Sequence, residues 1–277
     1  MSLFDPLVVA LDGSDTAAEA ARVARTITRG TGDTTILVTA VEDGGPGWSS
    51  EAELGAVGRA DQMLSAEAAR FRTPVDRRVV TGAPADAINR AVVAVEAGLL
   101  VMTPRGRGMI ASALLGSVSR DLLVQCRTSI LLVNAKVTSG HPVVCGVDGG
   151  PATGNVVAAA RALAQATGGP LHLLHVINAD PSVGKHPERY GIDPARWTAA
   201  CDAAIARAFE YARPESGGAV EVMRYGVPVE EISRYAQEQG AELVVVGRKG
   251  ESGADVDSFF SVAFGVAARG GFSTLIV

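Results

Sequence analysis

The chain has 277 residues, of which 47% are hydrophobic, 20% charged and 5% aromatic. This hydrophobic content excludes a disordered protein, and the length allows two ordinary domains or one large one. With 25 basic and 30 acidic residues, the formal net charge of −5 argues against binding to nucleic acid or to anionic membranes. Cys126, Cys145 and Cys201 form neither a disulfide framework nor a CxxC pair, so we expect reduced thiols.

The N-terminal sequence lacks the basic and apolar regions of a signal peptide. No apolar run reaches the roughly 18 residues that a membrane span needs. The richest run, Ala91–Met102, is interrupted by Glu96. We therefore expect a cytoplasmic protein without a membrane-spanning segment.

The features of the first half of the chain recur in the second half. An apolar run ends in Asp12-Gly13 and another ends in Asp148-Gly149, while a Gly-x-Pro sequence begins at Gly82 and again at Gly226. Matching features are separated by 136 to 144 residues throughout. The sequence therefore predicts two similar domains, residues 1–138 and 139–277.

In chain order, each copy alternates five strands with four helices. In the first copy, strands are predicted at 7–11, 35–41, 99–103 and 129–133, with a third strand between the second and third helices. These runs are apolar on both faces, which is typical of a buried parallel sheet. Thr16 and Glu19 form a capping-box pattern for the first helix, and Pro84 suits the first turn of the third. Each copy should be a doubly wound α/β domain, which binds ligands beyond the carboxyl ends of its strands.

The sequence Asp12-Gly13-Ser14 follows the first strand and has two interpretations. A carboxylate at a strand end can accept hydrogen bonds from a ligand, and glycine lets a ligand approach the backbone. The same three residue types also suit a simple strand-to-helix turn. The sequence alone leaves both interpretations open.

A glycine-rich segment follows the predicted fourth strand. It runs from Thr103 through Arg105, Gly106 and Gly108, and it ends in residues 116–119, Gly-Ser-Val-Ser, at a predicted helix start. Backbone N–H groups and a hydroxyl at the positive end of a helix suit a phosphate. Glycine is abundant in this chain, at 32 of 277 residues, so one glycine-rich loop is weak evidence for a binding site. The recurrence of such a loop at the same point of the second copy strengthens the interpretation.

Together, the Asp after strand one, the Gly-x-Pro and a loop close to G-x2-G-x9-G-S/T resemble the universal stress protein family. The best match is the stretch from Arg105 through Gly116-Ser117 to Val133, and the resemblance covers nearly the whole chain as two tandem domains. It implies two Rossmann-like domains, each a five-stranded parallel sheet in the order 3-2-1-4-5 flanked by helices. It also implies that ATP or another adenine nucleotide is the ligand, in some members with a divalent metal such as Mg²⁺, in a protein without general catalytic activity.

The two copies match the family pattern unequally. Thr103 replaces the first glycine of the first loop, whereas Phe260 replaces the last glycine of the second loop and Gly150 stands at the position of Ser14. The loop from 103 to 117 has a formal net charge of +2, and the loop from 247 to 261 has a formal net charge of −1. The formal net charge is −1 for residues 1–138 and −4 for residues 139–277. Because a triphosphate is repelled by carboxylates, the first domain should be the better nucleotide site.

The resemblance also assigns adenine recognition to main-chain groups after the second strand, at Val41 and, in the second copy, at Val176. The nucleotide-binding residues expected in the first domain are Asp12, Gly13, Ser14, Val41, Thr103, Arg105, Gly106, Gly108, Gly116, Ser117, Val118 and Ser119. Those expected for a weaker second site are Asp148, Val176, Gly247, Gly250 and Ser261.

We find no catalytic constellation in the sequence. His172 and His175 lie three apart on a predicted strand, so their side chains face opposite sides and cannot share a metal. No Walker lysine motif, G-x-S-x-G elbow or early G-x-G-x-x-G is present. A regulatory nucleotide-binding stress-response protein is therefore the first hypothesis, with a weak ATPase and a non-binding pseudo-dimeric scaffold as alternatives.

The last strand of each copy is strongly apolar. Ser129–Val133 and Ser273–Val277 are candidate sheet edges, which associate when they are left uncovered. We expect the two domains to pack about an internal pseudo-twofold through these strands, as dimers of the resembled family do. A homodimer of the whole chain is a further alternative.

Overall fold

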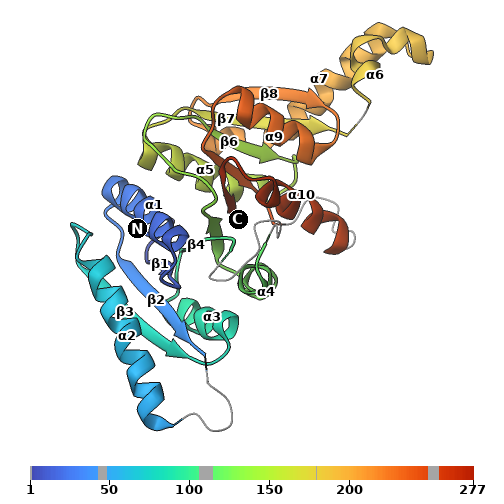
Figure 1. The fold of residues 1–277 in the computed structure, drawn as a ribbon. Helices are drawn as coiled ribbons and strands as arrows, with labels where there is room; N and C mark the ends of the chain where they lie inside the picture. Colours follow the sequence, from blue (N-terminus) through green and yellow to red (C-terminus); the bar gives the residue numbers. More distant parts are fainter. Residues whose placement is uncertain (1, 43–48, 106–114, 179, 249–255) are drawn as a thin grey trace. The chain divides into compact units, whose positions relative to one another are not determined.

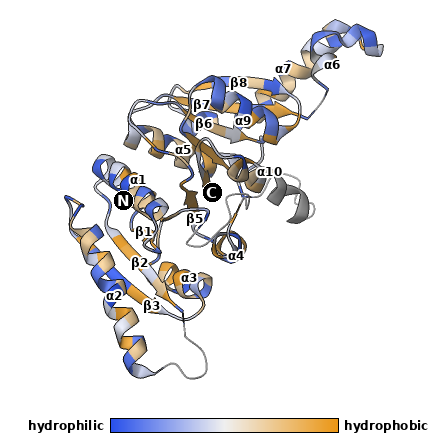
Figure 2. Ribbon diagram, in the orientation of Figure 1, coloured by the Kyte–Doolittle hydropathy of each residue, from blue (hydrophilic) through white to orange (hydrophobic). Residues whose placement is uncertain are grey.

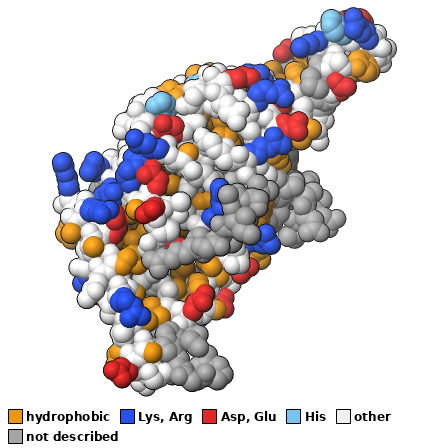
Figure 3. Space-filling model, viewed as in Figure 1, with side chains coloured by type: hydrophobic (Ala, Val, Ile, Leu, Met, Phe, Trp, Pro, Cys, Tyr) orange, Lys and Arg blue, Asp and Glu red, His pale blue; other side chains and the backbone are white. Residues whose placement is uncertain are grey.

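The computed structural model describes residues 2–42, 49–105, 115–178, 180–248 and 256–277. The chain divides into two compact units, Met1–Lys136 (unit 1) and Val137–Val277 (unit 2), drawn in Figure 1. No helix within the described ranges has the length and hydrophobicity that crossing a membrane requires. On the face drawn in Figure 3, basic and acidic side chains lie intermingled.

Unit 1 is built on a parallel sheet in the order β3-β2-β1-β4-β5. Its strands are β1 (Leu7–Ala10), β2 (Thr35–Val41), β3 (Val75–Thr81), β4 (Leu99–Met102) and β5 (Ser129–Leu132). The connecting helices are α1 (Asp15–Thr31), α2 (Ser50–Ala68), α3 (Pro84–Ala94) and α4 (Ser117–Gln125). The predicted order 3-2-1-4-5 is confirmed. Strand order reverses between β1 and β4, so a ligand site is expected at their carboxyl ends.

The core of unit 1 lies on both faces of β1 and β4. Every residue of these two strands is buried, as the doubly apolar pattern predicted. Helix α1 covers them with buried Val23, Ala24 and Ile27 along one face. Figure 2 shows the same distribution, with apolar residues concentrated on the strands.

Helix α1 begins differently from the predicted capping box. Its N-cap is Ser14, whose Oγ accepts a hydrogen bond from the Ala17 N–H at 3.1 Å. Glu19 instead pairs with Arg22, one turn further along the helix. The prediction from Thr16 and Glu19 was therefore wrong, because Ser14 lies closer to the strand and caps the helix first.

Helix α2 is mostly exposed and is attached to the unit near its C-terminal end. The Glu67 carboxylate pairs there with the Arg25 guanidinium of α1, and the two side chains are only 10% and 15% exposed. Arg70 also pairs with Glu67, at 3.0 Å. The Arg25 guanidinium lies 5.3 Å from the centre of the Phe71 ring, which adds a cation–π contact. This cluster fixes the end of α2 against α1.

Unit 2 repeats the same topology, with the strand order β8-β7-β6-β9-β10. Its strands are β6 (Val143–Val147), β7 (Leu171–Ile177), β8 (Val220–Tyr225), β9 (Leu243–Val246) and β10 (Ser273–Ile276). Its main helices are α5 (Thr153–Thr167), α7 (Pro194–Glu210), α9 (Pro228–Glu238) and α10 (Val256–Arg269). Three short helices, α6 (Pro181–Lys185), η1 (Pro187–Tyr190) and α8 (Arg213–Ser216), are additions that the repeat did not predict.

The start of unit 2 is fixed to its own sheet and helices. The Glu242 carboxylate, just before β9, accepts hydrogen bonds from the Thr138 backbone N–H and from its hydroxyl. The Gly140 N–H donates to the Thr167 carbonyl at 2.9 Å, at the end of α5. Beside this contact, Gly169 packs directly on the His141 carbonyl group. Residues 137–142 are therefore part of the packed unit.

Candidate functional site

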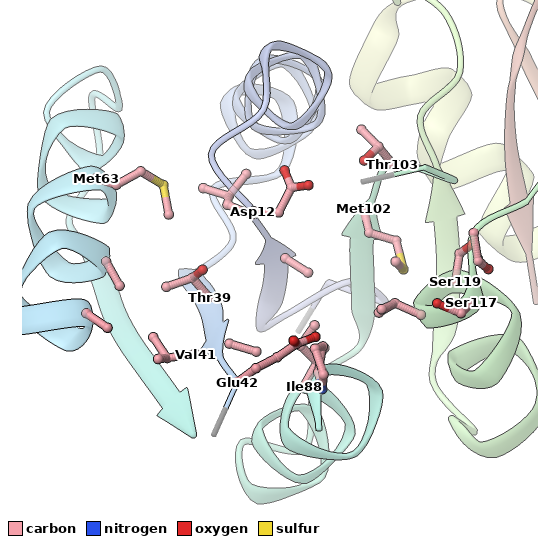
Figure 4. Close-up of a pocket in the computed structure, with 18 of the residues that line it drawn as sticks. Asp12, Thr39, Val41, Glu42, Met63, Ile88, Met102, Thr103, Ser117 and Ser119 are labelled. Carbon is pink, nitrogen blue, oxygen red and sulfur yellow. The ribbon is translucent and has the colours of Figure 1, made fainter. Parts of the chain in front are cut away.

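A cavity of about 780 Å³ opens at the carboxyl ends of β1, β2 and β4 in unit 1 (Figure 4). Helices α2, α3 and α4 contribute its other walls. This is the position that the reversal of strand order favours for a ligand. The cavity brings together seven of the predicted residues, which are Asp12, Val41, Thr103, Gly116, Ser117, Val118 and Ser119.

Asp12 lies at the end of β1 and combines the two roles that the sequence left open. Its Oδ1 atom accepts hydrogen bonds from the Ser14 N–H at 2.9 Å and from the Ser14 hydroxyl at 2.6 Å. Ser14 in turn caps α1, so the turn starts the helix. Asp12 also lines the cavity, whereas Gly13 and Ser14 do not. The turn thus holds a carboxylate at the cavity wall.

The segment after β4 is fixed by hydrogen bonds within the chain. The Thr103 hydroxyl donates to the Arg105 carbonyl at 2.8 Å, and the Gly116 N–H donates to the Pro104 carbonyl at 2.7 Å. The buried Ser119 hydroxyl lies 2.7 Å from the same Pro104 oxygen. Thr103 and Ser119 therefore use their hydroxyl hydrogens to shape the loop. The predicted residues Gly106 and Gly108 lie outside the described residues, and Arg105 does not line the cavity.

Helix α4 begins at this wall with its N-terminus toward the cavity. Gly116 is the N-cap and makes no side-chain capping hydrogen bond, and Ser117 and Val118 are the first helical residues. The N–H groups of a first helical turn have no partner inside the helix, and the helix dipole is positive there. This end of the cavity can therefore bind an anion.

The opposite wall contains residues that the sequence did not indicate. Helix α2 contributes Ala56, Arg59, Ala60 and Met63, and the end of β2 contributes Thr39 and Glu42. Figure 4 shows Met63 on this wall and Glu42 extending toward Ile88 of α3. Only Leu64 and Glu67 of α2 are buried, so its sequence carries no strong apolar stripe that marks an inner face. No signal in the sequence could have found Arg59.

The predicted second site falls on a smaller cavity in unit 2. This cavity measures about 240 Å³ and is lined by three of the predicted residues, Asp148, Val176 and Gly247. Gly250 lies outside the described residues, and so does the side chain of Ser261.

The strand register also identifies the true counterparts between the units. Leu7 pairs with Thr35 in β2, and Val143 pairs with Leu171 in β7. Counting along β2 and β7 from these pairs, Val41 corresponds to Ile177, and Val176 corresponds to Ala40. Val176, which the sequence analysis matched with Val41, therefore lies one residue before the position in β7 that corresponds to Val41.

Comparisons with known proteins agree with the duplicated fold. The model of the Universal stress protein family matches this sequence twice, over residues 3–134 and 140–277. A curated relative from Thermus aquaticus, described as "Universal stress protein in QAH/OAS sulfhydrylase 3'region", is 32% identical over 136 residues. The match covers 47% of this chain and 99% of the relative.

Solved structures extend this similarity over both units. A universal stress protein from Archaeoglobus fulgidus DSM 4304 is 16% identical, with a TM-score of 0.74 over 98% of this chain and 97% of that chain. Another structure is described as a universal stress protein in complex with cAMP. It is 27% identical and covers 48% of this chain and 98% of its own, with a TM-score of 0.37.

Proposed function

Because this chain belongs to the universal stress protein family, as two tandem copies, we propose that it binds an adenine nucleotide in the cavity of unit 1. We further propose that the bound nucleotide regulates the protein and is not turned over as a substrate. The observation that carries the proposal is a single cavity with an apolar middle, a carboxylate at one wall and a helix N-terminus at another.

The size and lining of the cavity support a nucleotide. Its volume of about 780 Å³ lies within the roughly 300–1,000 Å³ of typical ligand pockets. Met63, Ile88 and Met102 offer apolar surface to the faces of a base. The main chain at Val41 can exchange hydrogen bonds with the base edge, and Asp12 can accept hydrogen bonds from ribose hydroxyls.

The phosphate end is assigned to the start of α4. The N–H groups of Ser117 and Val118 and the Ser117 hydroxyl can donate to phosphate oxygens there, and Arg59 adds a positive charge to the cavity lining. If Mg²⁺ accompanies the phosphates, it would offset part of their charge. Asp12 and Glu42 are the carboxylates among the described lining residues.

Replacing Ser117 by proline should weaken ATP binding at least about tenfold while leaving the fold intact. Ser117 is the first helical residue, where proline is tolerated, and Gly116 has φ −74° and ψ 164°, which suits a residue before proline. The change removes an N–H and a hydroxyl, and one hydrogen bond to a charged group contributes about 1.5–3 kcal/mol. Isothermal titration with ATP measures the loss, and cAMP is titrated beside it as a second ligand.

The repeat provides a matched pair that locates the site. Asp12→Ala and Asp148→Ala remove corresponding carboxylates that stabilise corresponding turns. We expect only Asp12→Ala to reduce ATP affinity. Equal affinity of wild type, Ser117→Pro and Asp12→Ala would contradict the proposed site, and loss only in Asp148→Ala would move it to unit 2. Release of ADP that requires Mg²⁺ and Asp12 would favour the weak ATPase instead.

We also propose that the two units associate through their last strands, Ser129–Val133 and Ser273–Val277. Within its own unit, β5 pairs with β4 and β10 pairs with β9. A strand with an open side exposes every second N–H to water. Amide hydrogen exchange tests the proposal, because all amides of β5 and β10 should be protected if these strands are paired on both sides. Fast exchange at alternate residues would contradict it.

A further inference from the structure

The cavity of unit 2 differs from the cavity of unit 1 in size and lining. It measures about 240 Å³, which is less than a third of the cavity in unit 1 and below the usual range for ligands of nucleotide size. We propose that it binds a short primary alkylamine in its ammonium form. This inference goes beyond the nucleotide site of unit 1 and does not depend on it.

One difference between the two copies reduces the volume of the unit 2 cavity. By strand register, His175 occupies in β7 the position that Thr39 occupies in β2, so an imidazole ring replaces a small side chain at the cavity wall. On the opposite side the two cavities are alike, because Ile232 lies over Gly146 in unit 2 and Ile88 lines the cavity of unit 1. The imidazole ring therefore narrows the space that would receive a base.

Two side chains of this cavity, His175 and Asp148, offer hydrogen-bond acceptors. The Nδ1 atom of His175 lies 2.9 Å from the Val147 carbonyl oxygen, which can only accept, so Nδ1 carries the hydrogen. In the neutral ring, Nε2 is then an acceptor. Asp148 uses Oδ1 for the Gly150 N–H at 3.0 Å and the Thr153 hydroxyl at 2.8 Å. Its Oδ2 has no partner among the described residues.

The rest of the lining selects for a cation with an aliphatic body. Nine of the described lining residues are valine, leucine, isoleucine, alanine or proline, and none is lysine or arginine. Asp148 therefore gives the described lining a formal charge of −1. An ammonium group can donate three hydrogen bonds to such acceptors, and its alkyl chain can replace water along the aliphatic wall.

The test compares three probes of equal length: n-pentylamine, 1-pentanol and pentanoate. Saturation-transfer NMR on the full chain near pH 8.5 gives their dissociation constants. An alkylamine is protonated there, as a lysine side chain with a reference pKa of about 10.4 would be. We expect saturable binding of the amine, at least tenfold tighter than the alcohol, and no binding of the carboxylate. Equal binding of amine and alcohol would overturn the proposal, and so would absence of amine binding.

Matched variants test whether the amine binds in unit 2. Asp148→Asn keeps the oxygen that serves the turn and removes the charge, so it should abolish the preference for amine over alcohol. The corresponding change in unit 1, Asp12→Asn, should leave amine binding unchanged. Loss of binding in Asp12→Asn alone would overturn the assignment. ATP titration of the same samples keeps the outcomes separate, because wild type can bind ATP whether or not it binds the amine.

Discussion

Replacing Gly169 by alanine is expected to lower the free energy of unfolding of unit 2 by at least about 3 kcal/mol. The added Cβ would lie 1.9 Å from the His141 carbonyl oxygen and 2.8 Å from its carbon. Both atoms belong to the backbone, so no side-chain rotation can relieve the overlap. The Gly169 N–H also donates to the Ala164 carbonyl at 3.1 Å, which prevents a simple shift of the residue.

Urea unfolding followed by circular dichroism measures this change, and hydrogen exchange assigns it to residues 137–277. The control is Gly58→Ala on the exposed surface of α2, where the added Cβ has no atom within 4 Å. Alanine is the better helix former, so this variant should gain about 0.5–1 kcal/mol. A loss below 1 kcal/mol in Gly169→Ala would show that residues 140–142 can move away from the end of α5.

Replacing Glu67 by alanine should destabilise unit 1 by about 2–3 kcal/mol and weaken nucleotide binding. The change leaves the Arg25 guanidinium, only 15% exposed, without its carboxylate partner, and an uncompensated buried charge is costly. It also releases the anchored end of α2. That helix carries Arg59 and Met63 into the cavity, so the loss of position should reduce ATP affinity as well.

The control for this prediction is Glu53→Ala, at an exposed position in the first turn of the same helix. It should change stability by no more than about 0.5 kcal/mol. The double variant Arg25→Met with Glu67→Met should recover most of the lost stability, because an apolar pair of similar volume can replace a buried ion pair. If Glu67→Ala and Glu53→Ala cost the same, the cluster does not anchor α2.

The sheet could be predicted from the sequence because its signal is local and repeated. Runs such as Leu7–Leu11 are short, rich in branched residues and apolar at every position, which is typical of a strand buried on both faces. The duplication supplied a second copy of each strand. The short helices between 181 and 216 escaped prediction because they belong to unit 2 alone.

The candidate site was predictable only where residues directly follow a strand. Asp12 and Val41 lie at strand ends, so topology alone places them at one edge of the sheet. Arg59 and Met63 reach the cavity from the middle of α2, whose apolar and polar residues are not segregated clearly enough to mark an inner face. The hydrogen bonds of Thr103 and Ser119 depend on where the Pro104 carbonyl points, and residue types do not determine that direction.

The correspondence between Thr39 in unit 1 and His175 in unit 2 has a consequence for how the two halves can change over time. In a symmetric homodimer one gene position specifies both subunits, so a substitution that narrows one cavity narrows the other. Here the corresponding positions are encoded separately, and one holds a threonine while the other holds a histidine. Because the two halves lie in one chain, a substitution in one cavity leaves the sequence of the other unchanged, so each cavity can acquire its own ligand.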